Sequence, residues 1–283
     1  MHTAKLLVAT ALFLPACGGD QSASLGVGPR GGSAGSSDTP DGTLELAFDH
    51  LENERISAFV LLMAPPEELQ RMKDSWAEMQ RKPLEEADDA EFRQTMGMLT
   101  AEGAEDVLFA MVQPNLAEAQ KQLGNVAGMA PMMAAGAIQE SGAPEDTLVM
   151  IETIGAKLAS IDIASEEKAK KAIAIVCKAA REINVKSGAE MQKLSFEQAM
   201  KKADIAYAGV VDALAVYGLD FDETFQSLEA RVVSSAGDTA EVEVSVSLFG
   251  LEKKTIPVTM ERKAGRWFPK KDEAEGASSG MTR

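Results

Sequence analysis

The segment EVEVSVSL at residues 241–248 decides the fold class, because polar and apolar residues alternate through it without interruption. A period of two places the apolar side chains on one face of a β-strand and leaves the other face in water. Turn residues flank the segment, with Gly237-Asp238 before it and Gly250 after it. The alternation therefore predicts a strand that is followed and preceded by sharp turns.

The residues that follow predict the rest of a small antiparallel sheet. Apolar residues alternate again at Ile256, Val258 and Met260. A turn at Ala264-Gly265 then leads into Trp267. Connections this short predict a β-meander of three to four strands over residues 228–269. Pro257 has no N–H to donate, so its strand should lie at an edge or carry a bulge.

Upstream of the predicted sheet, the apolar spacing is helical over residues 43–218. One such stripe runs through Leu148, Ile151, Ile154, Leu158 and Ile161. Pro65-Pro66 and Pro83 should separate neighbouring helices, while Ser165 and Ser195 are placed as N-caps. The predicted fold class is α+β, mostly helical with a C-terminal antiparallel β-meander.

Residues 124–142 differ from the other helical segments because they combine glycines, Pro131 and the methionines Met129, Met132 and Met133. Glycine lowers helix propensity and an interior proline kinks or breaks a helix, so an interruption is expected here. Methionine adapts to apolar ligands, which makes these three methionines and Trp267 candidate ligand-binding residues. Core filling by all four side chains, and Cu(I) binding by the thioethers, are the alternatives.

The first residues have the composition of a secretory signal. Lys5 precedes an apolar run at residues 6–14, and Ala16 is followed directly by Cys17. The run is far shorter than the ~20 residues of a membrane-spanning helix. Leu14, Ala16 and Cys17 resemble the lipobox of bacterial lipoproteins. The resemblance implies cleavage after residue 16 and acylation of the Cys17 thiol, with fatty acids such as palmitate. An ordinary signal peptide with an incidental cysteine is the alternative.

The lipobox resemblance and the composition together divide the chain into four parts. They are a signal peptide at residues 1–16, a Gly/Ser-rich flexible tether at 17–42, a helix-rich globular ectodomain at 43–271 and a disordered tail at 272–283. In proteobacterial lipoproteins, an acidic residue directly after the cysteine favours retention at the inner membrane. Here Gly18 and Gly19 precede Asp20. The resemblance therefore implies an anchor in the outer membrane, with the ectodomain facing the periplasm.

Charge and composition narrow the class of partner. The net charge of −16 disfavours nucleic acid and anionic lipid headgroups. If Cys17 is acylated, Cys177 is the remaining thiol, and its apolar neighbours predict an inert core residue. His50 is the one histidine after the signal, so a zinc site of several His and Cys ligands cannot be built. We expect no cofactor and no metal. Membrane contact through the lipid on Cys17 is expected, with an apolar ligand or an envelope protein as partner.

The segment TIPVTMERKAGRW at residues 255–267, together with the first helices, resembles the nuclear-transport-factor-like fold of many small secreted bacterial domains. The resemblance implies a sheet that curls over the first helices and an apolar pocket between the sheet and the helices. Residues 66–194 would then form a large helical insertion. Most relatives of this type are not catalytic, so no functional residue is carried over.

Asp49 and His50 are the best acid–base pair in the chain, but no nucleophile accompanies them. A surface histidine on a polar helix face is the simpler interpretation, and we name no catalytic residue. The predicted function is that of a bacterial envelope lipoprotein whose ectodomain is a non-catalytic binding or protein-interaction module. A hydrolase acting on cell-envelope material is the alternative.

Overall fold

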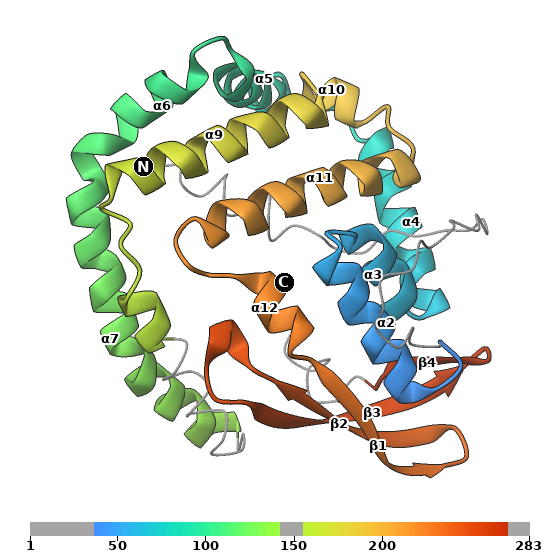
Figure 1. Ribbon diagram of the computed structural model, residues 1–283. Helices are drawn as coiled ribbons and strands as arrows, with labels where there is room; N and C mark the ends of the chain where they lie inside the picture. Colours follow the sequence, from blue (N-terminus) through green and yellow to red (C-terminus); the bar gives the residue numbers. More distant parts are fainter. Residues whose placement is uncertain (1–36, 142–154, 271–283) are drawn as a thin grey trace. The chain divides into compact units, whose positions relative to one another are not determined.

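The computed structural model describes residues 37–141 and 155–270, without the side chains of 130–141 (Figure 1). Within these ranges the chain is mainly helical and ends in a four-stranded antiparallel sheet, which confirms the predicted α+β class. The chain divides into two compact units. Within the described ranges, unit 1 comprises residues 37–82, 195–204 and 222–270, and unit 2 comprises the rest. The sequence predicted an ectodomain over residues 43–271.

Four consecutive strands form the sheet of unit 1 in the order β1-β2-β3-β4. They are β1 (Glu229–Ala236), β2 (Thr239–Val246), β3 (Lys254–Lys263) and β4 (Arg266–Pro269). In β2 the apolar residues from Ala240 to Val246 are buried, and the polar residues between them are exposed or half-buried. The predicted meander is therefore confirmed. The strand ends at Val246, because Leu248 already begins the 3₁₀ turn η2 (Leu248–Gly250).

The turn between β3 and β4 and the position of Pro257 agree with the predictions from the sequence. Ala264 and Gly265 both have positive φ, at 50° and 83°, which suits the type I′ turn that joins β3 to β4. Strand β4 pairs only with residues 260–263 of β3. Pro257 pairs with Glu243 of β2 and lies beyond the reach of β4. The strand therefore has a local edge at Pro257, as predicted.

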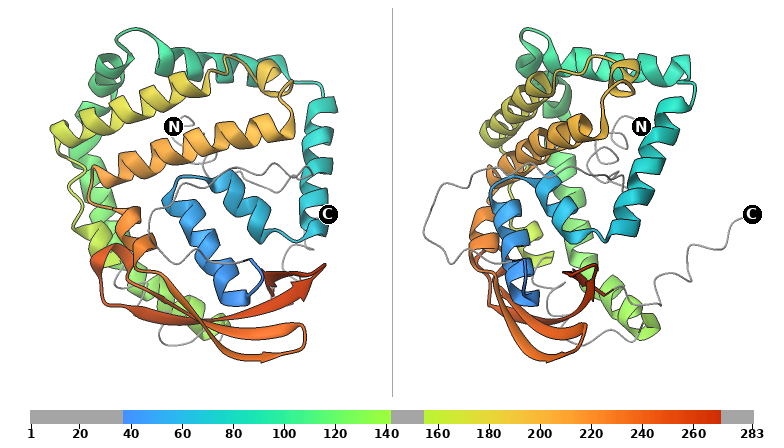
Figure 2. Two further views of the ribbon diagram at one scale, coloured as in Figure 1. Left: turned by 45° about the vertical axis from the view of Figure 1, so that its right-hand side comes forward. Right: turned by 90° about the vertical axis from the view of Figure 1, so that its right-hand side faces the viewer.

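Helix α2 (Pro40–Glu52) lies across one face of this sheet and completes the core of unit 1 (Figures 1 and 2). Leu44 and Phe48 of α2 pack against the buried sides of the strands, together with Met260 and Trp267. Phe268 is fully buried. Burying an apolar side chain such as Leu44 stabilises a fold by roughly 1.5–3 kcal/mol, so the core anchors α2 to the sheet.

Helix α2 begins at Pro40, before the boundary that the sequence predicted between tether and ectodomain at residues 42 and 43. The Thr39 hydroxyl accepts a hydrogen bond from the Gly42 N–H at 3.2 Å. Pro40 occupies the first turn, where its missing N–H does no harm. The Trp267 indole N–H also donates to the Asp38 carbonyl at 3.2 Å. Residues 37–42 thus belong to the fold, because the proline and glycine that suggested a tether form a helix start instead.

Of the other helices of unit 1, one starts at Pro66 as the sequence predicted, and a short one at 221–226 lies beyond the helical region predicted over residues 43–218. These helices are α3 (Ile56–Met63), α4 (Pro66–Arg81), the first part of α11 (Phe196–Ala215) and most of α12 (Phe221–Gln226). The capping box at Ser195 is confirmed, because its hydroxyl accepts from the Gln198 N–H at 3.2 Å and its N–H donates to Gln198 Oε1 at 2.8 Å. On α11, the Asp204 carboxylate accepts hydrogen bonds from the Ser57 N–H and hydroxyl, both at 2.7 Å, and so holds the start of α3.

Unit 2 is helical. Its described elements are α5 (Glu86–Thr100), α6 (Ala104–Val112), η1 (Gln113–Asn115), α7 (Leu116–Ser141), α9 (Glu166–Ile183), α10 (Gly188–Met191) and the rest of α11. Ser165 caps α9 as predicted. Cys177 is fully buried, which confirms it as a core residue, and burial is the main cause that raises its thiol pKa. Residues 155–159 are helical, and the earlier part of the helix predicted over 148–161 lies outside the described residues.

Helix α7 passes through Pro131 without a break. Of the kink or break predicted at this residue, the break is therefore absent. An interior proline costs a helix about 3 kcal/mol. Alanine and methionine, both strong helix formers, surround Pro131 and favour continuation on either side.

Candidate functional site

The ligand-binding candidates named from the sequence differ in their placement. Trp267 is 6% exposed in the core of unit 1, so core filling is its role in the structure. Met129 belongs to unit 2 and is 50% exposed on α7. The side chains of Met132 and Met133 lie outside the described residues. Of these four candidates, Met129 is the one that the structure shows on a surface.

Asp49 and His50 near the end of α2 do not form a catalytic arrangement. The Asp49 carboxylate binds Arg55 at 2.9 Å, while His50 Nδ1 lies 3.8 Å from Asp49 Oδ2, beyond hydrogen-bond range. Within the described part of the chain, Nδ1 has no hydrogen-bond partner. A hydrolase of this type needs a nucleophile bonded to the imidazole, and none of the described contacts supplies it.

The predicted surface position of His50 is wrong, because its side chain is only 16% exposed. Burial is the largest cause that lowers the pKa of His50, and the Arg55 guanidinium lowers it further against the opposing effect of Asp49. The imidazole is therefore neutral at pH 7. It is a half-buried structural side chain at the end of α2.

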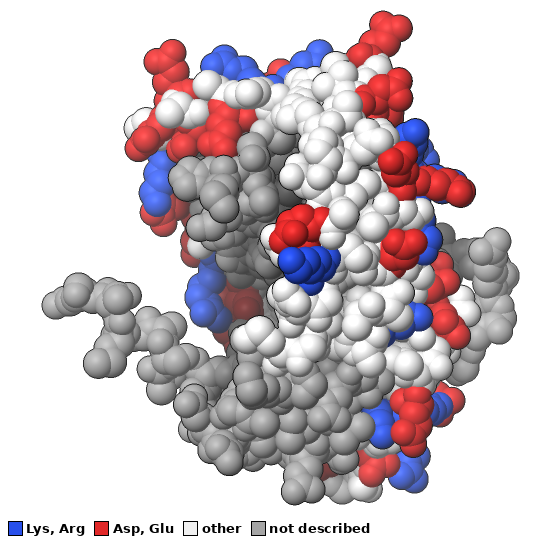
Figure 3. Space-filling model, turned by 90° about the vertical axis from the view of Figure 1, so that its left-hand side faces the viewer, with Lys and Arg blue, Asp and Glu red and all other residues white. Residues whose placement is uncertain are grey.

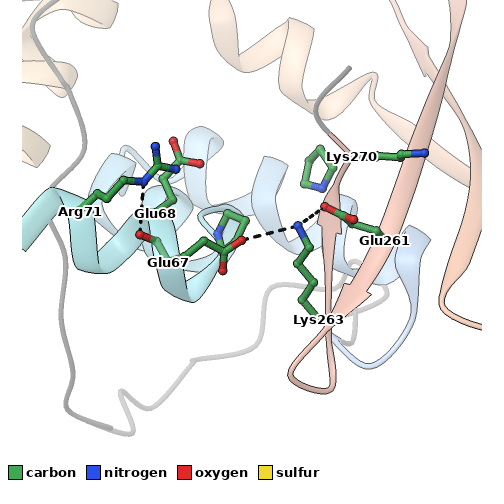
Figure 4. Close-up of a pocket in the computed structure, with 8 residues that line it drawn as sticks. Glu67, Glu68, Arg71, Glu261, Lys263 and Lys270 are labelled. Carbon is green, nitrogen blue, oxygen red and sulfur yellow. Dashed lines mark hydrogen bonds and ion pairs between the residues drawn. The ribbon is translucent and has the colours of Figure 1, made fainter. Parts of the chain in front are cut away.

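A hollow of about 240 Å³ lies between the start of α4 and the ends of β3 and β4 (Figure 4). Besides two prolines, it is lined by Glu67, Glu68, Arg71, Glu261, Lys263 and Lys270. Lys263 Nζ lies 2.5 Å from Glu261 Oε1 and 3.6 Å from Glu67 Oε1, so one ammonium bridges strand and helix. The lining holds three carboxylates and three cationic side chains, so the hollow has no net charge. Here, between sheet and helices, the lining is charged, whereas the fold resemblance implied an apolar pocket.

A second candidate site is the outer face of α6 and the first half of α7. Large apolar side chains are exposed there at Val107 (56%), Met111 (56%), Val112 (39%), Val126 (62%) and Met129 (50%). These five residues are called the α6–α7 apolar face below. Elsewhere in the described chain, exposed large apolar side chains are single residues on separate elements, at Leu61, Val210, Val233 and Ile256. The α6–α7 apolar face is therefore the one place where they gather among the described residues.

Charged residues are scarce around this face. Between Asp106 and Glu140 only Glu118 and Lys121 are charged, although 25% of the whole chain is charged. Figure 3 views the side of the molecule on which α6 and α7 lie, and much of the surface there is white, that is, uncharged. Exposed apolar patches mark interaction sites in soluble proteins, and among the described residues these two consecutive elements expose the most large apolar side chains.

The orientation of α6 is fixed by its contacts with α9. Phe109 is buried, and Lys170 Nζ lies 4.5 Å from the centre of its ring. Arg181 binds the Glu105 carboxylate at 2.6 Å. These contacts turn the opposite side of α6 outward, where Val107 and Met111 fall one turn apart.

The orientation of α7 is fixed by Gln120. Its amide oxygen accepts from the Ile163 N–H at 2.7 Å, and its amide nitrogen donates to the Ile161 carbonyl at 2.9 Å. Ala127, two turns along the same face, is buried. Val126 and Met129 consequently lie away from this contact. Apolar spacing alone predicted the α6 helix but not which of its sides is covered. The scarcity of charge over residues 107–139 was the signal that could have identified the exposed face.

Comparisons with protein-family models, with curated proteins and with solved structures found no match to this chain. The resemblances to the lipobox and to the nuclear-transport-factor-like fold therefore stay predictions from the residues that carry them. Cys17 lies outside the described residues. In the part of the chain that the structure describes, no helix is long and apolar enough to cross a bilayer.

Proposed function

We propose that this protein is a bacterial envelope lipoprotein, anchored through Cys17, whose ectodomain is a non-catalytic protein-interaction module. The observation that carries the proposal is the α6–α7 apolar face, which exposes five large apolar side chains on consecutive elements. An apolar face left in water promotes nonspecific association, so its retention in a chain of net charge −16 favours a dedicated partner.

The composition of the face indicates how it binds. Valine presents a stiff branched surface, whereas methionine adjusts its shape to the partner. With Glu118 and Lys121 as the only charges between Asp106 and Glu140, burial of apolar area is the main source of affinity. Binding should therefore change little with salt concentration, because screening acts on charges.

The anchor is tested by metabolic labelling of intact bacteria with a palmitate analogue. The unaltered chain should incorporate label and lose its first 16 residues, whereas Cys17→Ser should do neither. Cys177→Ser is the matched control, because this thiol is buried and should not affect labelling. Normal processing and labelling of Cys17→Ser would contradict the lipoprotein assignment.

The interaction role is tested by photo-crosslinking in intact cells. A photoreactive residue at position 107 should give a crosslinked protein species. Position 233 on β1 is the matched control, since Val233 is 55% exposed against 56% for Val107. Equal crosslinking from both positions, or none from position 107, would remove the α6–α7 apolar face as the binding site.

A further inference from the structure

We infer that the partner of the α6–α7 apolar face is a second copy of this chain, joined in a two-fold dimer. The inference rests on the proposed function, because that proposal gives the face a binding role. Its own foundation is the charge distribution around the face and the self-complementarity that a symmetric contact requires.

Charge disfavours a strongly acidic or basic partner and is compatible with a second copy. A basic partner would be matched by a face rich in acidic residues, and an acidic partner by a face rich in lysine and arginine. Over residues 107–139 this chain carries one acid, Glu118, and one base, Lys121, so the region has no net charge. A face of this kind is electrostatically complementary to itself. Two copies of net charge −16 can therefore meet here without adding local repulsion between like charges.

Two-fold symmetry also requires that the face be complementary to itself. In a two-fold dimer, the same patch of both copies forms the contact, so the patch must be complementary to itself. Valine and methionine side chains meet this condition, because apolar burial has no direction. Glu118 and Lys121 lie three residues apart on exposed positions of α7. An antiparallel pairing of two α7 helices allows each of these charges to meet the opposite charge of the other copy.

The size of the face predicts a weak dimer. Stable interfaces bury about 800 Å² on each partner, which is more than five partly exposed side chains supply. Anchoring both copies in one membrane compensates, because it confines them to a surface and raises their effective concentration. Self-association should therefore be measured on the anchored, full-length chain rather than in dilute solution.

The experiment co-expresses two full-length copies with different C-terminal tags in the same cells, each with a photoreactive residue at position 107. Irradiation should produce a species that carries both tags and has twice the monomer mass. Adding Val126→Asp or Met111→Asp to both copies should reduce this species by about tenfold or more, because each places a carboxylate in an apolar contact. Val233→Asp is the control and should leave its amount unchanged.

Two outcomes would overturn the inference, and they differ in what they say of the proposed function. A crosslinked species without the second tag, which is lost in Val126→Asp, would show that the face binds a different protein. This result would support the proposed interaction module and contradict the proposed dimer. No crosslinked species at all from position 107 would remove both proposals together.

Discussion

The two compact units of this protein differ in how many large apolar side chains they leave exposed. In unit 1 the core consists of large residues, and Leu44, Met260, Trp267 and Phe268 are 3%, 0%, 6% and 0% exposed. In unit 2 the buried side of α9 is mostly alanine, while Val107 and Met111 of neighbouring α6 are each 56% exposed. Unit 1 therefore keeps its largest side chains inside its own fold and exposes only single apolar residues, at Leu61, Val233 and Ile256. Unit 2 keeps several large apolar residues on a surface, where they are available to a partner.

Buried and exposed apolar side chains contribute differently to the free energy of folding. Apolar burial stabilises by roughly 25 cal/mol for each Å² removed from water, so large side chains in a core contribute more than alanines do. An exposed valine contributes little to folding until something covers it. The same residue types thus act on stability in unit 1 and on binding in unit 2, and variants can separate the two effects.

The largest expected difference is between a core aromatic and an exposed methionine. Phe268→Ala should lower the free energy of unfolding by about 3–5 kcal/mol, because it leaves a cavity in a fully buried position. Met111→Ala should change it by no more than about 0.5 kcal/mol. Urea unfolding followed by circular dichroism measures both. A comparable loss for Met111→Ala would mean that α6 is covered by its own chain.

A glycine pair sharpens the comparison within unit 2. A Cβ on Gly209 would lie 2.5 Å from the Ala179 Cβ, whereas a Cβ on Gly124 would meet nothing within 4 Å. Gly209→Ala should therefore destabilise by about 1–3 kcal/mol through overpacking. Gly124→Ala should stabilise by about 0.5–1 kcal/mol through helix propensity. If thermal unfolding shows no loss for Gly209→Ala, the close contact between α9 and α11 is absent.

Removing a polar contact in unit 1 should lower the free energy of unfolding by a smaller amount. Asp204→Ala removes the acceptor for both the N–H and the hydroxyl of Ser57 and should cost about 1–2 kcal/mol. Ser57→Ala is the matched control, because it removes only the hydroxyl donor and keeps the backbone bond. It should lose less than Asp204→Ala in the same denaturation assay. Equal losses would show that the backbone bond adds nothing.

The smallest effect is the pH dependence due to His50. Its folded-state pKa lies below the ordinary value of 6.5, mainly because of burial. In the window between the two pKa values the unfolded chain binds more protons, so the free energy of unfolding falls as pH decreases through it. His50→Gln should flatten this dependence below about pH 6.5 and leave it unchanged above. Parallel pH profiles of the two proteins would contradict the lowered pKa.

Local chemistry made part of the fold predictable. The alternation at residues 241–246 identified β2, and the side chains of Ser165 and Ser195 identified two helix starts, because each depends on residues within one turn. The start of α2 was missed, since Pro40 and Gly42 have the composition of a loop and their burial depends on contacts elsewhere in unit 1. The half-buried position of His50 was missed for the same reason, because apolar spacing says nothing of what packs against a helix end.

The candidate site was less predictable than the fold. The spacing of Val107 and Met111 predicts a helix whichever side is covered, and the structure places these residues outward because Phe109 and Glu105 contact α9. Trp267 shows the opposite case, since the sequence left both ligand binding and core filling open and the structure places this side chain in the core. Exposure is a tertiary property, and periodicity alone does not decide it.

Thiol accessibility in intact cells tests the central claim most directly. Val107→Cys and Val233→Cys place thiols at positions of matched exposure, and the native Cys177 is buried. We expect a membrane-permeant maleimide to label position 233 rapidly and position 107 slowly in cells. Both positions should react at similar rates once the cells are lysed and the protein is diluted. Equal rates at the two positions in intact cells would contradict the claim that a partner covers the α6–α7 apolar face.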